Sequence, residues 1–222
     1  MDDVPVDKAG ARVREDASVR LRGAALRFVS RGGVKLDGAL EDFDLAVAGL
    51  RCLDVGASTG GFSDCLLQRG AASVVAVDVG RGQLHERLRQ DPRLRLIERQ
   101  NARDLRPEHV GGPVDLVVID VSFISLRQVL PAVADVVGDA PIVALVKPQF
   151  EVGREHVGKG GVVRDDALRS RVVDEIGSFA AGLGYRERGR SESRIAGPKG
   201  NREVFLWLER LERLERLDRS SR

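Results

Sequence analysis

Four charged residues lie at or near the ends of apolar runs, where their side chains could carry out acid–base chemistry. Asp120 ends "DLVVID", Lys147 ends "IVALVK" and Glu203 opens "EVFLWL", while Lys35 follows "SRGGV" in a short amphipathic segment. A single lysine at a strand end is more typical of the protein surface, and a single carboxylate there often caps a helix. Asp120 and Lys147, however, end runs that we expect to form neighbouring strands, so the four residues form a candidate tetrad.

The use of lysine at two of these positions is informative because lysine is scarce. The 36 basic residues include only five lysines, so arginine serves wherever a permanent charge suffices. Lysine can lose its proton when a second cation and low-dielectric surroundings lower its pKa, whereas arginine cannot. A neutral amine at one of these positions could therefore act as a general base on an alcohol.

A glycine-rich turn follows the first apolar run and could bind a nucleoside cofactor. "LDVGASTGGF" places Gly56, Gly60 and Gly61 between a buried strand and a helix, where glycine lets the backbone approach a ligand. The spacing G-x-x-x-G-G does not match the dinucleotide fingerprint G-x-G-x-x-G. Asp54 could orient this turn and a ligand ammonium, and Asp78, at the end of the next strand, could accept both ribose hydroxyls of an adenosine. These features favour S-adenosylmethionine over a nicotinamide dinucleotide.

The elements that must position these residues alternate between buried strands and helices. We expect strands within 51–56, 73–80, 94–100, 114–123 and 141–150, and helices within 61–70, 82–89, 125–137 and 165–184. The strands are near-continuous Val, Ile and Leu runs, which indicates burial on both faces of a parallel sheet. Residues 185–195 and 202–210 have no helix between them and should form a hairpin. The fold class is therefore α/β, a doubly wound Rossmann-like sheet, mostly parallel with one antiparallel strand near the C-terminus.

Length and composition limit the remaining possibilities. The 222 residues, 42% hydrophobic, suit one sizeable domain. No stretch reaches the ~18 uncharged apolar residues of a membrane helix, and the acidic start "MDDVPVDKAG" shows no secretory signal. Cys52 and Cys65 form no disulfide framework, and His85, His109 and His156 have no metal-site spacing. We expect a cytoplasmic protein that requires no metal.

Basic residues are unevenly distributed, although the net charge is only +2. Residues 186–202 contain six basic side chains against two acidic ones, and the first thirty residues are also rich in arginine. Such segments could neutralise phosphates, although a solvated charged surface is the alternative. The candidate contacts to an RNA substrate are Arg31, Arg194, Lys199 and Arg202.

From Ser30 to about Leu208, the sequence resembles the TlyA, or hemolysin A, family of ribosomal RNA 2′-O-methyltransferases, which have the FtsJ-like methyltransferase fold. Eight motifs carry the resemblance in order: "SRGGVKL", "LDVGASTGGFSDCLL", "VDVGRGQL", "NAR", "DLVVIDVSFISL", "LVKPQFE", "GGVVRD" and "GPKGNREVFLWL". The resemblance implies methyl transfer from S-adenosylmethionine to a cytidine ribose 2′-hydroxyl in RNA of the small and large ribosomal subunits.

The resemblance also implies residue roles. Lys35, Asp120, Lys147 and Glu203 match a Lys-Asp-Lys-Glu catalytic tetrad, in which Lys147 is the candidate base or oxygen-positioning group. Lys35 would favour the neutral form of Lys147, and the carboxylates of Asp120 and Glu203 would orient the two amines. Cofactor contacts are expected from Asp54, Gly56, Ala57, Ser58, Thr59, Gly60, Gly61, Phe62, Asp78, Val79, Asn101, Ala102 and Asp120.

The expected organisation has three parts. Residues 1–29 form an N-terminal arm, in which "VPVDKAGARV" resembles the final hairpin of the family's small RNA-binding domain. Residues 30–210 form the methyltransferase domain, and 211–222 are a low-complexity charged tail without an assigned role. Two alternatives are a cytolysin, suggested only by the hemolysin name, and a non-catalytic RNA-binding protein whose cofactor pocket is a relic. The sequence predicts no oligomeric state.

Overall fold

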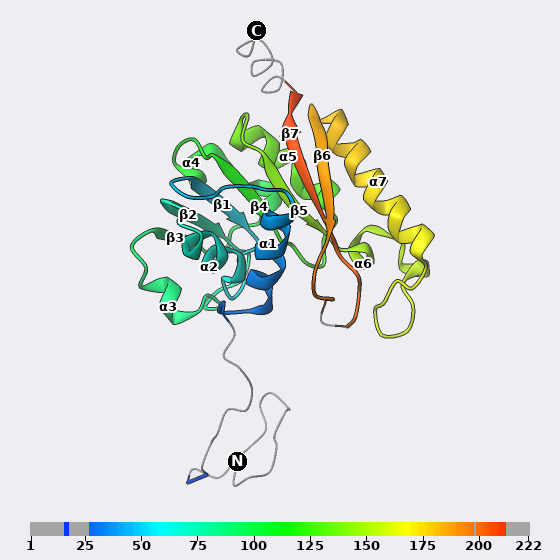
Figure 1. The fold of residues 1–222 in the computed structure, drawn as a ribbon, viewed down its shortest axis with the longest axis horizontal. Helices are drawn as coiled ribbons and strands as arrows, with labels where there is room; N and C mark the ends of the chain where they lie inside the picture. The colour runs from blue at the N-terminus through cyan, green and yellow to red at the C-terminus, as the bar shows by residue number, and fades with distance from the viewer. Residues whose placement is uncertain (1–15, 18–26, 198, 212–222) are drawn as a thin grey trace.

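The computed structural model describes residues 16–17, 27–197 and 199–211. Seven strands form one sheet in the order β3-β2-β1-β4-β5-β7-β6 (Figure 1). The strands are β1 (Arg51–Val55), β2 (Ser73–Val77), β3 (Leu94–Ile97), β4 (Leu116–Ile119), β5 (Ile142–Val146), β6 (Tyr185–Glu192) and β7 (Val204–Arg210). All seven lie within the runs from which strands are predicted.

Strand direction confirms the mostly parallel sheet. β1 to β5 pair in parallel, β7 is antiparallel to β5, and β6 is antiparallel to β7. β6 therefore runs in the same direction as β1 to β5, and the one reversed strand, β7, lies inside the sheet with β6 at its edge. This reversal brings the start of β7 to the same edge of the sheet as the carboxyl ends of β4 and β5.

Helices cover both faces of the sheet. α1 (Arg31–Asp42), α2 (Gly61–Gln68) and α3 (Glu86–Arg89) contribute to one hydrophobic cluster, and α4 (Pro107–Val110), α5 (Leu126–Val137) and α7 (Asp166–Gly182) to the other. The short α6 (Pro148–Glu151) follows β5, and single 3-10 turns occupy Ala102–Asp104 and Arg154–His156.

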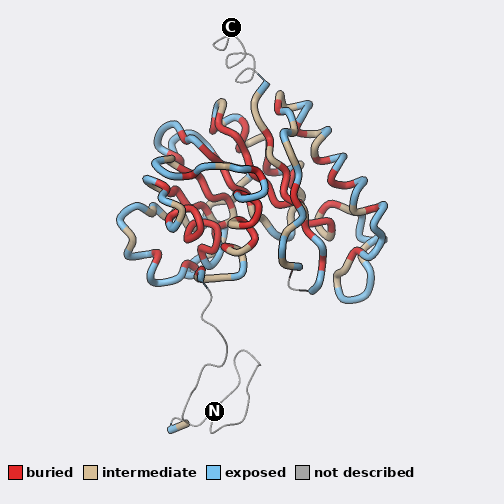
Figure 2. The backbone as a smooth tube through the Cα atoms, viewed as in Figure 1, coloured by how far each residue is buried: buried red, intermediate tan, exposed pale blue. Residues whose placement is uncertain are grey.

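The continuous apolar runs are explained by burial on both faces (Figure 2). In β5, Ile142, Ala144 and Val146 join the cluster under α5 and α7, while Val143 and Leu145 join the cluster under α1 and α2. Successive side chains of a strand point to opposite faces, so a strand covered twice needs apolar residues at every position.

One helix is shorter than predicted. Residues 82–89 were expected to be helical, but α3 occupies only Glu86–Arg89 and is capped by the imidazole of His85. Gly82 has a φ of 69° and donates its N–H to Glu98, so the chain makes a turn before the helix can begin. The predicted hairpin at 4–13 and the tail at 212–222 lie outside the described residues.

Candidate active site

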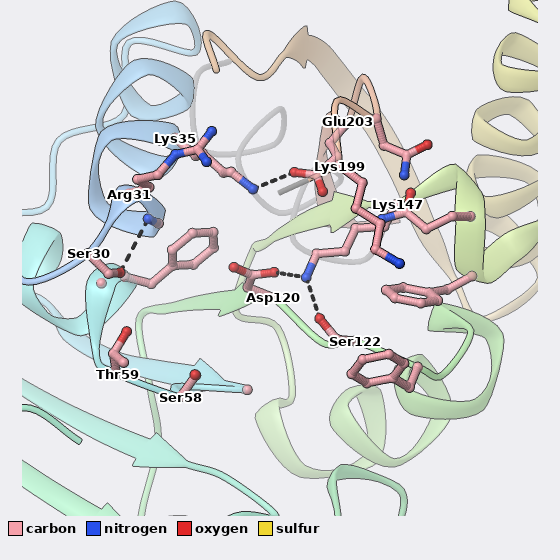
Figure 3. A pocket seen from close by; sticks show the side chains of 18 of the residues that line it. Ser30, Arg31, Lys35, Ser58, Thr59, Asp120, Ser122, Lys147, Lys199 and Glu203 are labelled. Atoms are coloured by element: carbon pink, nitrogen blue, oxygen red, sulfur yellow. Dashed lines mark hydrogen bonds and ion pairs between the residues drawn. The ribbon is translucent and has the colours of Figure 1, made fainter. Parts of the chain in front are cut away.

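Lys147 and Asp120 meet at the carboxyl edge of the sheet, as their positions after β5 and β4 predict. Nζ of Lys147 lies 2.5 Å from Oδ1 of Asp120 and donates a hydrogen bond of 2.8 Å to Oγ of Ser122 (Figure 3). Pro148 is the first residue of α6, with Lys147 as its N-cap. Because proline has no N–H to donate, it cannot continue the strand, which ends at Val146, and it starts the helix. The lysine therefore lies at a defined boundary, with only 9% of its surface exposed.

Lys35 and Glu203 form the second ion pair of the site. Nζ of Lys35, on α1, lies 2.5 Å from Oε2 of Glu203, which immediately precedes β7. Lys35 is 6% exposed and Glu203 is 1% exposed, so both charges are removed from bulk solvent. Oε1 of Glu203 has no hydrogen-bond partner among the described residues. This pair is held by two elements that are 168 residues apart in the chain.

Both ion pairs line one cavity of about 650 Å³. Figure 3 shows the Lys35–Glu203 pair on one side and Lys147 between Asp120 and Ser122 on the other. The wall is completed by the glycine-rich turn, by Ser30 and Arg31 at the start of α1, and by residues of α6 and of three loops: Gln149 and Phe150 of α6, and Phe123, Val157, Gly161, Lys199 and Asn201. The structure thus brings all four members of the predicted tetrad to one cavity.

A second cavity, of about 530 Å³, adjoins the first. The two share Gly56, Ser58, Asp120, Ser122 and Phe123. The second is also lined by four residues predicted to bind the cofactor: Asp78, Val79, Asn101 and Ala102. Asp120 therefore lies where the two cavities meet.

The glycine-rich turn is shaped by close backbone contacts. Gly56 has a φ of 92°, and a Cβ atom there would lie 2.4 Å from the carbonyl oxygen of Asp120. Only glycine permits β1 and β4 to approach so closely at their ends. Oδ2 of Asp78 accepts a hydrogen bond of 2.7 Å from the backbone N–H of Ser58, and Oδ1 accepts one of 2.6 Å from Gly80. Asp78 therefore fixes the turn as well as lining the second cavity.

The remaining residues of the turn divide into two groups. Ala57, Ser58, Thr59, Gly61 and Phe62 line the first cavity. Gly60 lines neither cavity: its φ is 94°, and a Cβ there would lie 2.3 Å from the side chain of Leu88. Its place in the sequence motif reflects packing of α2 against α3.

Asp54 lies beneath the site and lines neither cavity. It is fully buried, and its Oδ2 accepts a hydrogen bond of 2.6 Å from Oγ of Ser63 on α2. Burial raises the pKa of Asp54 to about 7, against the lowering effect of the Ser63 hydrogen bond. Oδ1 has no partner among the described residues. Asp54 therefore joins β1 to α2 on either side of the glycine-rich turn.

The four predicted RNA contacts occupy different surroundings. Arg31 and Lys199 line the first cavity, and Arg31 also donates to the carbonyl oxygen of Ala196. Arg194 forms ion pairs with Glu41 and Asp42 on α1, at 2.6 and 2.8 Å. Arg202 forms an ion pair of 2.7 Å with Glu192. The structure brings only the first two to the cavity, and all four contacts remain predictions.

Three residues that the sequence did not single out also line the first cavity. Ser122 is bonded to Lys147, and Phe123 is 91% exposed, with a φ of 65° and its ring centre 5.2 Å from that of Phe150. Asn201 is buried, donates to the carbonyl oxygen of Gly161 and accepts from the N–H of Val163, so it joins two of the loops that form the wall. The sequence signal that could have identified Ser122 and Phe123 is their position two and three residues after Asp120.

The two cysteine residues lie in the protein interior. Cys52 and Cys65 are buried free thiols, and burial raises the pKa of each to about 12. Within residues 27–197 and 199–211, no cluster of three or more His, Cys, Asp or Glu side chains is placed to hold a metal ion. No helix in the part of the chain that the structure describes is long and apolar enough to cross a membrane.

Comparisons with known proteins identify several similar chains. The sequence profile of the FtsJ-like methyltransferase family matches residues 28–210. The 16S/23S rRNA (cytidine-2′-O)-methyltransferase TlyA of Mycobacterium tuberculosis is 54% identical over 210 residues, which cover 94% of this chain and 78% of the relative. Hemolysin A of Brachyspira hyodysenteriae is 43% identical over 80% of this chain and 75% of its own. A solved structure from Streptococcus thermophilus, provisionally described as a hemolysin, superposes with a TM-score of 0.81 at 47% identity, covering 86% of this chain and 70% of its own.

Proposed function

Because the chain belongs to the FtsJ-like methyltransferase family, we propose that it transfers a methyl group from S-adenosylmethionine to the ribose 2′-hydroxyl of cytidine in ribosomal RNA. One observation carries the assignment beyond family membership. Two lysine–carboxylate pairs, from four elements distant in sequence, line a single cavity beside a glycine-rich turn. This arrangement suits transfer to an alcohol, which needs a base and a fixed oxygen.

The second cavity has features suited to S-adenosylmethionine. Asp78 lies at the end of β2, where a carboxylate can accept ribose hydroxyl hydrogens, and Asn101 and Ala102 lie on the facing turn. Gly56, which lines both cavities, carries no side chain and can therefore approach the carbonyl of Asp120 closely. The nucleoside part would occupy the second cavity, and the amino-acid part and methyl group would point toward Asp120. When bound, S-adenosylmethionine supplies an electrophilic methyl group.

The protein's own residues would align the accepting hydroxyl. Lys147 lies beside Asp120, at the boundary of the two cavities, and is the group we assign to the ribose oxygen. The Lys35–Glu203 pair faces it across the first cavity and would hold the ribose from the other side. Holding the nucleophile in line can supply about 7 kcal/mol or more of the barrier reduction. The first cavity would thus take the target nucleotide.

The RNA strand would be held around this cavity. Arg31 and Lys199 lie on its wall and would contact phosphates.

Three further points belong to the same proposal. The protein would act on RNA of both ribosomal subunits, and it would do so in the cytoplasm. The chain would consist of an arm at 1–29, a methyltransferase domain at 30–210 and a tail at 211–222.

The direct test is a tritiated-methyl assay on separated ribosomal subunits from a cell that lacks the enzyme, followed by mapping of the modified ribose. The proposal expects label on a cytidine 2′-oxygen in each subunit. Label on only one subunit would limit the proposed substrate to the RNA of that subunit. Label on a base or on a protein would contradict the proposed methylation of a ribose hydroxyl. Calorimetry with S-adenosylmethionine tests the non-catalytic alternative, which expects no binding even at millimolar concentrations of the cofactor. Leakage from liposomes by purified protein, unchanged in Lys147→Ala, would instead support a cytolysin.

A further inference from the structure

Ser122 occupies a position next to Lys147 that the tetrad does not account for. Its exposed side chain lies in the loop between β4 and α5, on the wall of both cavities. Oγ of Ser122 accepts a hydrogen bond of 2.8 Å from Nζ of Lys147 (Figure 3). The amine therefore contacts both an anion, Asp120, and a neutral hydroxyl.

The two contacts differ in kind. Nζ lies 2.5 Å from Oδ1 of Asp120, but that oxygen has no partner among the described residues that meets hydrogen-bond geometry. The contact is an ion pair, which attracts charge without fixing the direction of an N–H bond. The directional contact is the one to Ser122, because a hydrogen bond weakens steeply when its angle departs from linearity. Ser122 is thus the group that can set the rotation of the amine.

The backbone that carries Ser122 is itself fixed. The N–H of Asp120 donates to the carbonyl of Val55 at 2.9 Å, and Gly56 packs against the carbonyl of Asp120. Ser122 lies two residues beyond this anchored strand end. Its hydroxyl can therefore act as a stationary acceptor.

We propose that Ser122 is a positioning residue that orients the amine of Lys147 for catalysis. A neutral primary amine has two hydrogens and one lone pair. Once one hydrogen is donated to Ser122, two positions remain on Nζ: the attraction of Asp120 favours the second hydrogen on the side of Asp120, and the lone pair takes the other position, toward the ribose hydroxyl. This inference rests on the proposed function and deepens it, because it assigns Lys147 the role of base rather than only of oxygen-positioning group.

The proton balance of the step is complete. As the ribose oxygen bonds to the methyl carbon, the carbon–sulfur bond breaks and leaves its electron pair on sulfur, neutralising the sulfonium. The hydroxyl proton passes to Nζ of Lys147, which becomes an ammonium with three hydrogens. Two remain directed to Ser122 and Asp120, and the third is the proton just received, which is later released to solvent.

The test compares Ser122→Ala and Ser122→Thr with the wild type. Single-turnover transfer and steady-state kinetics are measured on ribosomal subunits, together with S-adenosylmethionine affinity by calorimetry. We expect Ser122→Ala to lower kcat about 10- to 100-fold, the range for loss of one hydrogen bond to a charged group, because the amine becomes an ammonium as it takes the proton. KM for RNA and the Kd of the cofactor should stay within about threefold, since Ser122 acts through Lys147. Ser122→Thr keeps the hydroxyl and should recover most of kcat. Ser178→Ala, at an exposed position on α7, is the matched control.

The outcomes separate this inference from the function on which it rests. An unchanged kcat in Ser122→Ala, or a rise in KM alone, would overturn the positioning role while leaving the methyltransferase assignment intact. Failure of Ser122→Thr to recover kcat would also overturn it, because the loss would then come from packing. Absence of transfer by the wild-type protein would overturn both.

Discussion

Nζ of Lys147 and Oδ1 of Asp120 lie 2.5 Å apart although their residues end different strands of the sheet. Ile119 pairs with Ala144, so Lys147 lies two residues beyond the level of Asp120. The long lysine side chain spans this offset. The pair therefore depends on the parallel register of β4 and β5, and their side chains are brought together at the boundary of the two cavities.

Replacement of Lys147 should abolish transfer while leaving the cofactor site intact. We expect Lys147→Ala to reduce kcat by about 10²- to 10⁴-fold, the usual contribution of a general base. Lys147→Arg should be almost as inactive, because arginine cannot lose its proton. Calorimetry should show S-adenosylmethionine binding in both variants. Substantial activity in Lys147→Arg would show that a permanent positive charge suffices and that Lys147 only holds the oxygen.

The buried pair of Lys35 and Glu203 should behave as a coupled unit in unfolding experiments. Lys35→Met or Glu203→Gln leaves one charge buried without its partner, so each should lower the free energy of unfolding by about 3 kcal/mol. The double variant removes both charges of this pair. Its free energy of unfolding should therefore fall by less than the sum of the two single losses. Urea denaturation of the four proteins measures the coupling. Additivity within about 0.5 kcal/mol would contradict an energetic link between α1 and β7 through this pair.

Phe123 should contribute to RNA binding because it exposes an aromatic ring beside the first cavity. Stacking of one base on such a ring contributes about 1 to 3 kcal/mol. Phe123→Ala should therefore raise KM for RNA or lower kcat/KM about 5- to 150-fold, with unchanged thermal stability because the ring is exposed. Phe123→Tyr keeps the ring and should remain active. Since Phe123 lines both cavities, an equal loss of S-adenosylmethionine affinity would instead assign the ring to the cofactor.

A methyl group at Gly56 should disrupt the junction between the two cavities. Gly56→Ala combines a positive φ with a Cβ 2.4 Å from the backbone of Asp120. We therefore expect the free energy of unfolding to fall by about 3 kcal/mol or more, and the variant to bind no cofactor. Gly82→Ala is a matched control, since Gly82 has a φ of 69° but no atom within 4 Å of the added Cβ. Gly82→Ala should lower the free energy of unfolding by only about 1 kcal/mol. Similar losses in the two variants would show that the contact with Asp120 can relax.

Asp54 should make the stability of the protein depend on pH between about 4 and 7. Its folded-state pKa of about 7 exceeds the ordinary value of 3.8 for an aspartate, so the folded state holds the proton more tightly than the unfolded state. The stabilisation is complete below the unfolded pKa and is lost as the pH rises through 7. Asp54→Asn removes this titration while keeping an oxygen for Ser63. The difference in unfolding free energy between wild type and variant should change by about 4 kcal/mol across this range. A constant difference would mean that Asp54 is not titrating there.

The sequence predicted the part of the site that depends on strand order. Asp120 and Lys147 end two continuous apolar runs, and such runs become neighbouring parallel strands, so their meeting follows from local pattern and topology. The place of β7 inside the sheet also has a signal in retrospect. Its "VFLWL" is apolar at every position, whereas β6, "YRERGRSE", is rich in charged residues, as an edge strand often is.

Other features could not be predicted because they depend on tertiary contacts. The pairing of Lys35 with Glu203 requires α1 to lie over the start of β7, which no local pattern specifies. Phe123 has a positive φ without being glycine or asparagine, so nothing in its residue type marks the turn. The hydrogen bond between Ser63 and Asp54 also depends on the packing of α2 against β1, whereas a contact of Asp54 with a ligand ammonium, through its backbone or a water molecule, stays a prediction. Arg194 and Arg202 lie in a basic segment of sequence, yet each has a carboxylate neighbour in space.

The antiparallel insertion of β7 also has a consequence for the order in which the site can be completed during synthesis. β1 to β5 can emerge and pair while the chain is still being made, but Glu203 and the strand that covers β5 belong to the last part of the described chain. A nascent chain that ends before β7 has Asp120 and Lys147 without the partner of Lys35, and one edge of β5 remains unpaired. Assembly of the tetrad therefore waits until the chain has left the ribosome as far as β7, so a chain truncated before β7 would carry the cofactor turn without the complete tetrad.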